Sequence, residues 1–169
     1  EFVRAAPGGL GSAKVGANYV ASLYAAERAK DAGYAQVLWT DAVHHKYLEE
    51  VGTMNVFVRI GDQVITPPAG GTTLAGVTRD SVLALLRDWN IDAQERPITV
   101  DEVLAASRRG ELHEMFGTGT AAVISPVGTL GFRGETLHIG DGQPGEVSQR
   151  LFRALRDIQR GTAPDPYGW

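Results

Sequence analysis

Cysteine is absent from this chain of 169 residues, which is the length of one ordinary domain. The absence excludes disulfides, thiolate metal ligands and a cysteine nucleophile, and it fits a reducing compartment such as the cytoplasm. Long apolar runs are also lacking, and none approaches the ~20 residues of a membrane-spanning helix. The formal net charge is −4 with both signs scattered along the chain, so we expect no nucleic-acid or membrane partner.

Lysine is scarce as well, because the chain has only Lys14, Lys30 and Lys46. The last two lie in charged or polar segments, but Lys14 has no charged neighbour between Arg4 and Glu27 and stands among small residues. A lysine in a glycine-rich turn is usually a solvated loop residue. Small neighbours would also let a flat carbonyl cofactor approach a reactive amine, so Lys14 is a candidate for Schiff-base chemistry.

The hydrophobic pattern predicts a mixed α/β domain with an open or barrel-like mixed sheet and helices outside it. Expected helices cover residues 17–31, 78–89, 99–108 and 145–160, and Thr99 with Glu102 has the spacing of a capping box. Expected strands cover residues 1–5, 36–39, 55–60, 63–66, 94–97, 121–127 and 130–139, and another ends at 115–116. The polar segment 40–50 is expected to be a turn and connection.

A pyridoxal phosphate site around Lys14 would need three further groups: an acid or base at the ring nitrogen, donors for the phosphate and a partner for the phenolic oxygen. Glu50, just before a predicted strand, could pair with the ring nitrogen, although its neighbour Glu49 competes by composition. Taken alone, a glutamate in such a place is more often a solvated turn residue. Tyr19, which follows Lys14 by five residues, could bond the phenolic oxygen.

Two turns of small residues could hold the phosphate. Residues 74–78 open the clearest predicted helix, where free N–H groups and the helix dipole favour an anion. Simple capping is the alternative there, because Asp80 in the first turn could satisfy the dipole unaided. Residues 117–121 offer exposed N–H groups and two hydroxyls, but they lack the lysine and the spacing of a nucleotide-binding P-loop.

The histidines do not indicate a metal site. His44 and His45 are adjacent, which is poor geometry for two ligands on one ion. His113 and His138 lack a matching carboxylate motif. We therefore expect no bound metal.

These motifs, in this order, resemble the branched-chain amino acid aminotransferases, which are fold-type IV pyridoxal phosphate enzymes. The similarity extends from Arg4 to Gly161, and its best-matched pieces are residues 14–19, 50–55, 74–80 and 119–122 with Pro126. The resemblance implies the large cofactor domain of that fold, with a barrel-like mixed sheet and outer helices. It also implies that residues 1–169 are this C-terminal domain, and that the smaller N-terminal domain of the family is absent from the chain.

The resemblance implies a role for each matched residue. Lys14 would form the Schiff base with pyridoxal 5'-phosphate and move the proton between the substrate α-carbon and the cofactor. Tyr19 would bond the phenolic oxygen, and Glu50, rather than Glu49, would pair with the pyridine nitrogen. Thr53 would lie close to the ring.

The remaining matches concern the ring face, the phosphate and the substrate. Leu74 would pack on the ring, and Gly76 would permit close approach of the phosphate. The phosphate would be held by Val77, Thr78 and Thr120, and the substrate carboxylate by Thr120 and Ala121. One departure is Ala17, which replaces a usual glycine and would add a methyl group to the loop.

The implied reaction is transamination between leucine, isoleucine or valine and 2-oxoglutarate, in a cytoplasmic homodimer. Because the family's N-terminal domain supplies part of the site, we expect residues 1–169 alone to be inactive. Two alternatives lie within the same fold group, the D-amino acid aminotransferases and the aminodeoxychorismate lyases. A non-catalytic anion-binding domain is a further alternative, and a nucleotide-binding module is disfavoured because no P-loop or dinucleotide fingerprint is present.

Overall fold

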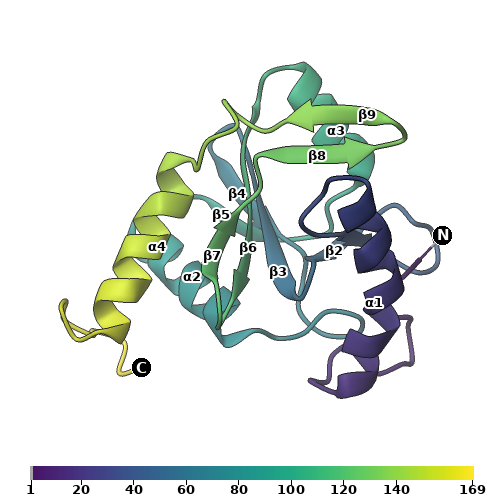
Figure 1. The fold of residues 1–169 in the computed structure, drawn as a ribbon. Coiled ribbons are helices and arrows are strands. Elements are labelled where there is room, and N and C mark those ends of the chain that lie inside the picture. The colour runs from purple at the N-terminus through teal and green to yellow at the C-terminus, as the bar shows by residue number, and fades with distance from the viewer. Residues whose placement is uncertain (1) are drawn as a thin grey trace.

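The computed structural model describes residues 2–169, which form a mixed α/β domain (Figure 1). The helices are α1 (Gly16–Asp31), α2 (Val77–Asp88), α3 (Val100–Arg108) and α4 (Glu146–Gln159). The strands are β1 (Leu38–Thr40), β2 (Leu48–Val51), β3 (Met54–Ile60), β4 (Gln63–Thr66), β5 (Ala93–Glu95), β6 (Leu112–Gly119), β7 (Val123–Pro126), β8 (Thr129–Phe132) and β9 (Glu135–His138). None of the helices described here is long and apolar enough to cross a bilayer.

Strand β3 is the centre of the main sheet. Along one edge it pairs with β6, and along the other it pairs first with β2 and then with β4, all antiparallel. Strand β5 adds to β4 in parallel, while β1 and β7 lie outside β2 and β6. Within residues 2–169 these pairings describe an open, branched sheet, so the barrel-like closure is not confirmed.

The sheet separates two apolar layers, because side chains alternate across a strand. On β3, Val56 and Val58 pack in one layer with α3 and the β8–β9 hairpin, whereas Phe57 packs in the other with α2 and α4. Phe57 stacks on Phe116 of β6 with ring centroids 5.3 Å apart. Figure 1 shows α2 and α4 together on one side of the sheet, and α1 lies apart from them.

The four predicted helices are confirmed to within about a residue at each end. Thr99 is confirmed as the N-cap of α3, since its hydroxyl accepts a hydrogen bond from the Glu102 N–H at 3.0 Å. The Glu102 carboxylate does not complete the capping box. It pairs instead with Arg96 at 2.6 Å, a stronger charge-assisted partner than a backbone amide.

Several strand predictions were wrong. Residues 2–5 are not a strand, and segment 40–50 contains most of β2, whose polar side chains are buried by tertiary partners. Strand β6 continues through Gly119 because β7 pairs with it up to that residue. The single strand expected over 130–139 is a hairpin, and its turn at Arg133 and Gly134 has positive φ at both residues.

Candidate active site

Several of the predicted site residues lie at the end of the sheet where β3 begins and β6 ends. Asn55, at the start of β3, lies opposite Glu50 of β2 on one edge and Thr118 of β6 on the other. Its Nδ2 donates a hydrogen bond to the carbonyl oxygen of Leu74 at 2.8 Å. Asn55 therefore joins the predicted ring-nitrogen carboxylate, the predicted ring-packing residue and the small-residue turn, which are far apart in the sequence.

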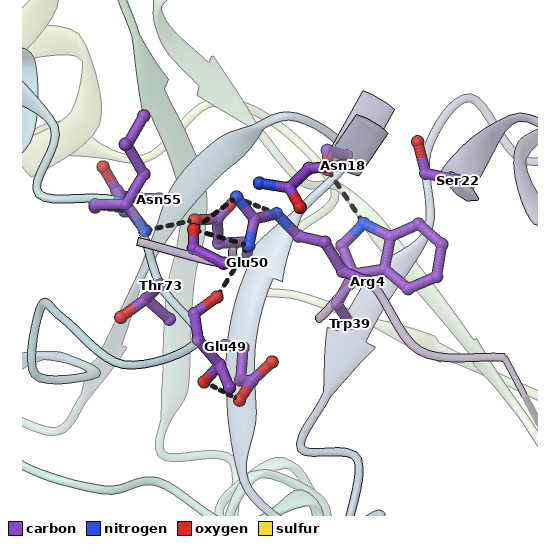
Figure 2. A network of polar contacts seen from close by, with 12 residues as sticks. Arg4, Asn18, Ser22, Trp39, Glu49, Glu50, Asn55 and Thr73 are labelled. Carbon is purple, nitrogen blue, oxygen red and sulfur yellow. Dashed lines mark hydrogen bonds and ion pairs between the residues drawn. The ribbon is translucent and has the colours of Figure 1, made fainter. Parts of the chain in front are cut away.

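Glu50 is the most constrained carboxylate at this end of the sheet. Its side chain is buried, with the residue 2% exposed. One oxygen accepts the Leu74 N–H at 2.8 Å and the other faces Arg4 Nε at 2.7 Å (Figure 2). Burial raises the pKa of Glu50 to about 7; the Leu74 N–H and the Arg4 charge act in the opposite direction, and the Glu49 charge adds to the rise.

Glu49 differs from its neighbour in every contact, because adjacent strand residues face opposite sides of a sheet. It is buried too, and one of its oxygens accepts a hydrogen bond from the Thr72 hydroxyl. Its other oxygen has no hydrogen-bond partner among the described residues, and burial raises its pKa. Both carboxylates thus contact the loop that carries Leu74, but Glu50 bonds Leu74 itself whereas Glu49 bonds Thr72.

The loop that carries Lys14 is fastened beside the Leu74 loop. Gly11 packs so closely that a Cβ there would lie 2.6 Å from the Thr72 carbonyl oxygen. The Asn18 side chain donates to the carbonyl oxygens of Leu10 and Ala13 at 2.7 and 2.9 Å. Lys14 follows immediately, exposed and next to Val15, the N-cap of α1.

Two further candidates are partly or fully exposed. Tyr19 is half-buried on α1, and Thr53 is exposed in the two-residue turn between β2 and β3. Gly52 begins that turn with φ +58°, a left-handed conformation that favours glycine. Ala17 is exposed, so its extra methyl group does not crowd the lysine loop.

The start of α2 matches the first phosphate candidate. Gly76 is the N-cap, and no side chain caps the helix although Asp80 lies in its first turn. The first N–H groups of the helix therefore stay available to an anion, while the Asp80 charge in the first turn remains the alternative partner of the helix dipole. Val77 is 81% exposed, whereas Thr78 is buried. Gly76 packs against Asn55, whose Oδ1 a Cβ on residue 76 would meet.

The second phosphate candidate forms the turn between β6 and β7. Thr120 and Ala121 are exposed there. Thr118, the last buried residue of β6, is 1% exposed, and its hydroxyl has no hydrogen-bond partner in the described part of the chain. Gly117 lies against the neighbouring turn, since a Cβ there would lie 2.8 Å from Met54 Cε. The small residues thus allow the β6–β7 turn to approach the start of β3, close to the Thr118 hydroxyl that lacks a partner within residues 2–169.

Sequence reasoning had assigned no role to Arg4 or Asn55. Arg4 is 7% exposed in a segment of apolar and small residues, and this isolation of one charge is the signal that could have marked it. Asn55 stood within a recognised motif but without a function. No group of three or more His, Asp or Glu side chains within residues 2–169 is placed to hold a metal ion.

Comparison with known proteins places these features in a family. Residues 2–130 match the amino-transferase class IV family. The whole chain is 52% identical to branched-chain-amino-acid transaminase 1 of Bacillus subtilis strain 168 and covers 48% of that protein. It is 48% identical to a probable branched-chain-amino-acid aminotransferase of Streptomyces coelicolor, covering 47% of it. The chain therefore spans about half the length of these curated relatives.

Solved structures agree with this assignment. The Escherichia coli branched-chain amino acid aminotransferase superposes over 100% of this chain and 52% of its own, with a TM-score of 0.85 and 29% identity. A second branched-chain amino acid aminotransferase, solved in complex with N-(5'-phosphopyridoxyl)-L-glutamate, covers 94% of this chain and 50% of its own, with a TM-score of 0.79 and 32% identity. Sequence and fold together make this chain a member of the class IV aminotransferase family.

Proposed function

We propose that residues 1–169 are the cofactor-binding half of a pyridoxal phosphate-dependent branched-chain amino acid aminotransferase. The reaction would exchange the amino group of leucine, isoleucine or valine with 2-oxoglutarate. Support comes from the curated relatives, which are named branched-chain-amino-acid transaminases and are about 50% identical to this chain over its full length. The remaining half of those relatives has no counterpart in this sequence, so residues 1–169 by themselves would be inactive. An assay of this chain beside the complete enzyme tests that point.

The observation that carries the proposal is the set of polar groups that Asn55 brings together. Glu50 is buried with a raised pKa, the α2 N-terminus has no side-chain cap, and the buried Thr118 hydroxyl has no partner within residues 2–169. Native proteins rarely leave a buried hydroxyl such as that of Thr118 without a partner. A protonated pyridine ring would pair with the buried Glu50 carboxylate, and a phosphate would accept from the helix N–H groups and a nearby hydroxyl, so the residues present fit the cofactor.

Each residue would then have a defined task. Pyridoxal phosphate supplies an aldehyde for the amino group and a ring that withdraws electrons from the α-carbon. Glu50 would accept a hydrogen bond from the ring nitrogen, Leu74 would pack against the ring face, and Tyr19 would donate to the phenolic oxygen, with Thr53 close by. The Lys14 amine would hold the cofactor at rest and carry the α-proton during turnover.

The anionic groups would be held by backbone donors. The phosphate would meet the N–H groups of Val77 and Thr78 beside Gly76, together with the Thr78 and Thr120 hydroxyls. The substrate carboxylate would meet the N–H groups around Thr120 and Ala121. We further propose a cytoplasmic homodimer with small-molecule substrates and no nucleic-acid partner.

Borohydride trapping tests the proposal. The complete enzyme is incubated with pyridoxal phosphate, reduced and digested, and the modified lysine is found by mass spectrometry. We expect stoichiometric label on Lys14, retained in Lys30→Ala and lost in Lys14→Ala. Label scattered over Lys14, Lys30 and Lys46 would contradict the proposal. Turnover with L-leucine, but not with D-alanine or aminodeoxychorismate, separates the branched-chain reaction from its relatives.

A further inference from the structure

Arg4 is buried and makes polar contacts with three other residues. Its Nε lies 2.7 Å from Glu50 Oε2, and its Nη1 donates to the Thr72 carbonyl oxygen at 2.6 Å. Nη1 and Nη2 both reach the Gly11 carbonyl oxygen at 3.3 Å. Figure 2 shows its guanidinium beside the Glu50 carboxylate. One planar group thus binds three separate segments of the chain.

Each of those segments carries a residue of the proposed site. Gly11 precedes Lys14 by three residues, and Thr72 precedes Leu74 by two. Glu50 is itself the proposed partner of the ring nitrogen. Burying an arginine is costly unless its charge is paired and its N–H groups are satisfied. Here the satisfied guanidinium ties the lysine loop, the ring-packing loop and the carboxylate together.

We propose that Arg4 is a positioning residue, which orients the Glu50 carboxylate toward the ring nitrogen, preserves its negative charge and fixes the lysine and Leu74 loops around it. This inference rests on the proposed function. Arg4 does not touch the reacting atoms, because its donors are occupied by Glu50, Gly11 and Thr72.

The charges around Glu50 support this role. The groups that act on its carboxylate are the Arg4 guanidinium, the Leu74 N–H and the Glu49 carboxylate. The first two favour the ionised form, and the third opposes it. Without Arg4, Glu50 would keep one backbone donor beside a buried carboxyl group of like charge. It would then take up a proton more readily and lose its ability to hold the ring nitrogen protonated.

Kinetics of the complete enzyme with pyridoxal phosphate provide the first test. We expect Arg4→Met to lower kcat about 10- to 100-fold, the range seen when the outer partner of an active-site ligand is removed. The KM for L-leucine should change much less. Arg4→Lys should recover part of kcat, because an ammonium keeps the charge but cannot reproduce the planar fork. Arg59→Met, which removes the partner of Glu114 away from the site, is the matched control and should leave kcat unchanged.

The ring nitrogen provides a readout that loss of stability would not move. With ¹⁵N-labelled cofactor, the nitrogen chemical shift should report a protonated ring in the wild type and in Arg59→Met. It should move toward the unprotonated value in Arg4→Met and move less in Arg4→Lys. If Arg4→Met does not fold, Arg4→Lys decides by the same two measurements.

A double substitution closes the test. If Arg4 acts through Glu50, then Arg4→Lys should cost little further kcat in a Glu50→Gln background. Additive losses, or Arg4 variants that match Arg59→Met in kcat and nitrogen shift, would overturn the role of Arg4 and leave the proposed function standing. A wild-type enzyme that transaminates neither branched-chain amino acids nor D-alanine would overturn both.

Discussion

Two buried glutamates at opposite ends of β3 each form an ion pair with an arginine, yet their other hydrogen-bond partners differ. Glu50 and Glu114 are 2% and 4% exposed, and each pairs with an arginine, Arg4 or Arg59. Glu114 also accepts the N–H groups of Val147 and Ser148 at the start of α4 (both 2.9 Å). Glu50 has a single backbone donor, at Leu74.

Hydrogen-bond donors around each carboxylate decide the direction of its pKa shift. Burial raises the pKa of Glu114, but the N–H groups of Ser148 and Val147, together with the Ser148 hydroxyl and Arg59, outweigh burial and lower the pKa overall. For Glu50, burial wins and the pKa rises to about 7. Glu114 is therefore a structural cap of α4, whereas each Glu50 oxygen has a single partner among the residues described and can accept another hydrogen bond. A buried carboxylate with a raised pKa and spare acceptor capacity is typical of a site that binds a donor.

The strongest test of this comparison is to remove the negative charge of Glu50 and of Glu114 in separate variants. In the complete enzyme, Glu50→Gln should bind the cofactor yet lower kcat about 10²-fold or more, as loss of a preorganised electrostatic group does. Glu114→Gln should leave kcat within a few-fold of wild type. Near-normal turnover in Glu50→Gln would contradict the assignment of this residue to the ring nitrogen.

Stability should respond to both glutamates. Glu114→Ala removes the cap of α4 and leaves Arg59 without its partner, so the free energy of unfolding should fall by about 3 kcal/mol. Urea denaturation of the cofactor-free protein measures this loss. Glu50→Ala should also destabilise the cofactor-free protein, because it leaves the more deeply buried Arg4 without its partner. An unchanged urea midpoint in Glu114→Ala would contradict its role as the cap of α4.

The pH dependence of stability separates the two carboxylates further. The folded state holds the Glu50 proton more tightly than the unfolded chain, since its pKa moves from 4.5 to about 7. Stability present below pH 4.5 should therefore be lost as the pH rises toward about 7, and Glu50→Gln should flatten this slope. Glu114 has the opposite sign, because its lowered pKa makes stability fall as the pH drops below 4.5. Urea midpoints measured from about pH 2 to 8 test both signs.

Close packing at the site gives a smaller effect. Gly76→Ala would place a methyl group against Asn55 Oδ1 and disturb the bond from Asn55 to Leu74. An overpacking cost of roughly 1.4 kcal/mol corresponds to about a tenfold loss of pyridoxal phosphate affinity. Gly16→Ala is the control, because a Cβ there meets nothing within 4 Å. Equal affinities of the two variants, measured by fluorescence titration, would argue against a phosphate at Gly76.

The smallest expected change concerns the Thr118 hydroxyl. Thr118→Val removes a buried oxygen that has no partner within residues 2–169, so the cofactor-free protein should gain about 1 kcal/mol of stability. Thr66→Val is the contrast, because the Thr66 hydroxyl donates to the Val56 carbonyl oxygen at 2.7 Å and its loss should destabilise. Thermal melts of both variants without cofactor check the two signs. A loss of stability in Thr118→Val would mean that its hydroxyl is already satisfied.

The sequence by itself determined the helices, the β3–β4 hairpin and the identity of the candidate residues. Helix period, glycine stops and the Thr99 cap are local signals, and the motifs around Lys14, Glu50, Leu74 and Thr120 are contiguous. The burial of β2 could not be predicted from the sequence, because two adjacent glutamates are typical of a solvated segment. They are buried here because Arg4 and Thr72, from distant parts of the chain, bind their carboxylates.

Only the tertiary structure decided which polar groups are satisfied. The register of β3 brings Asn55 opposite both Glu50 and Thr118, and the fold brings Arg4 against segments up to 68 residues away. Hydrogen bonds and desolvation depend on such distant neighbours, so neither the pKa of Glu50 nor the central place of Arg4 follows from local pattern. The order of residue types along the sequence identified the candidate site residues. The three-dimensional packing of hydrogen-bond donors around each carboxylate distinguished Glu50 from Glu114.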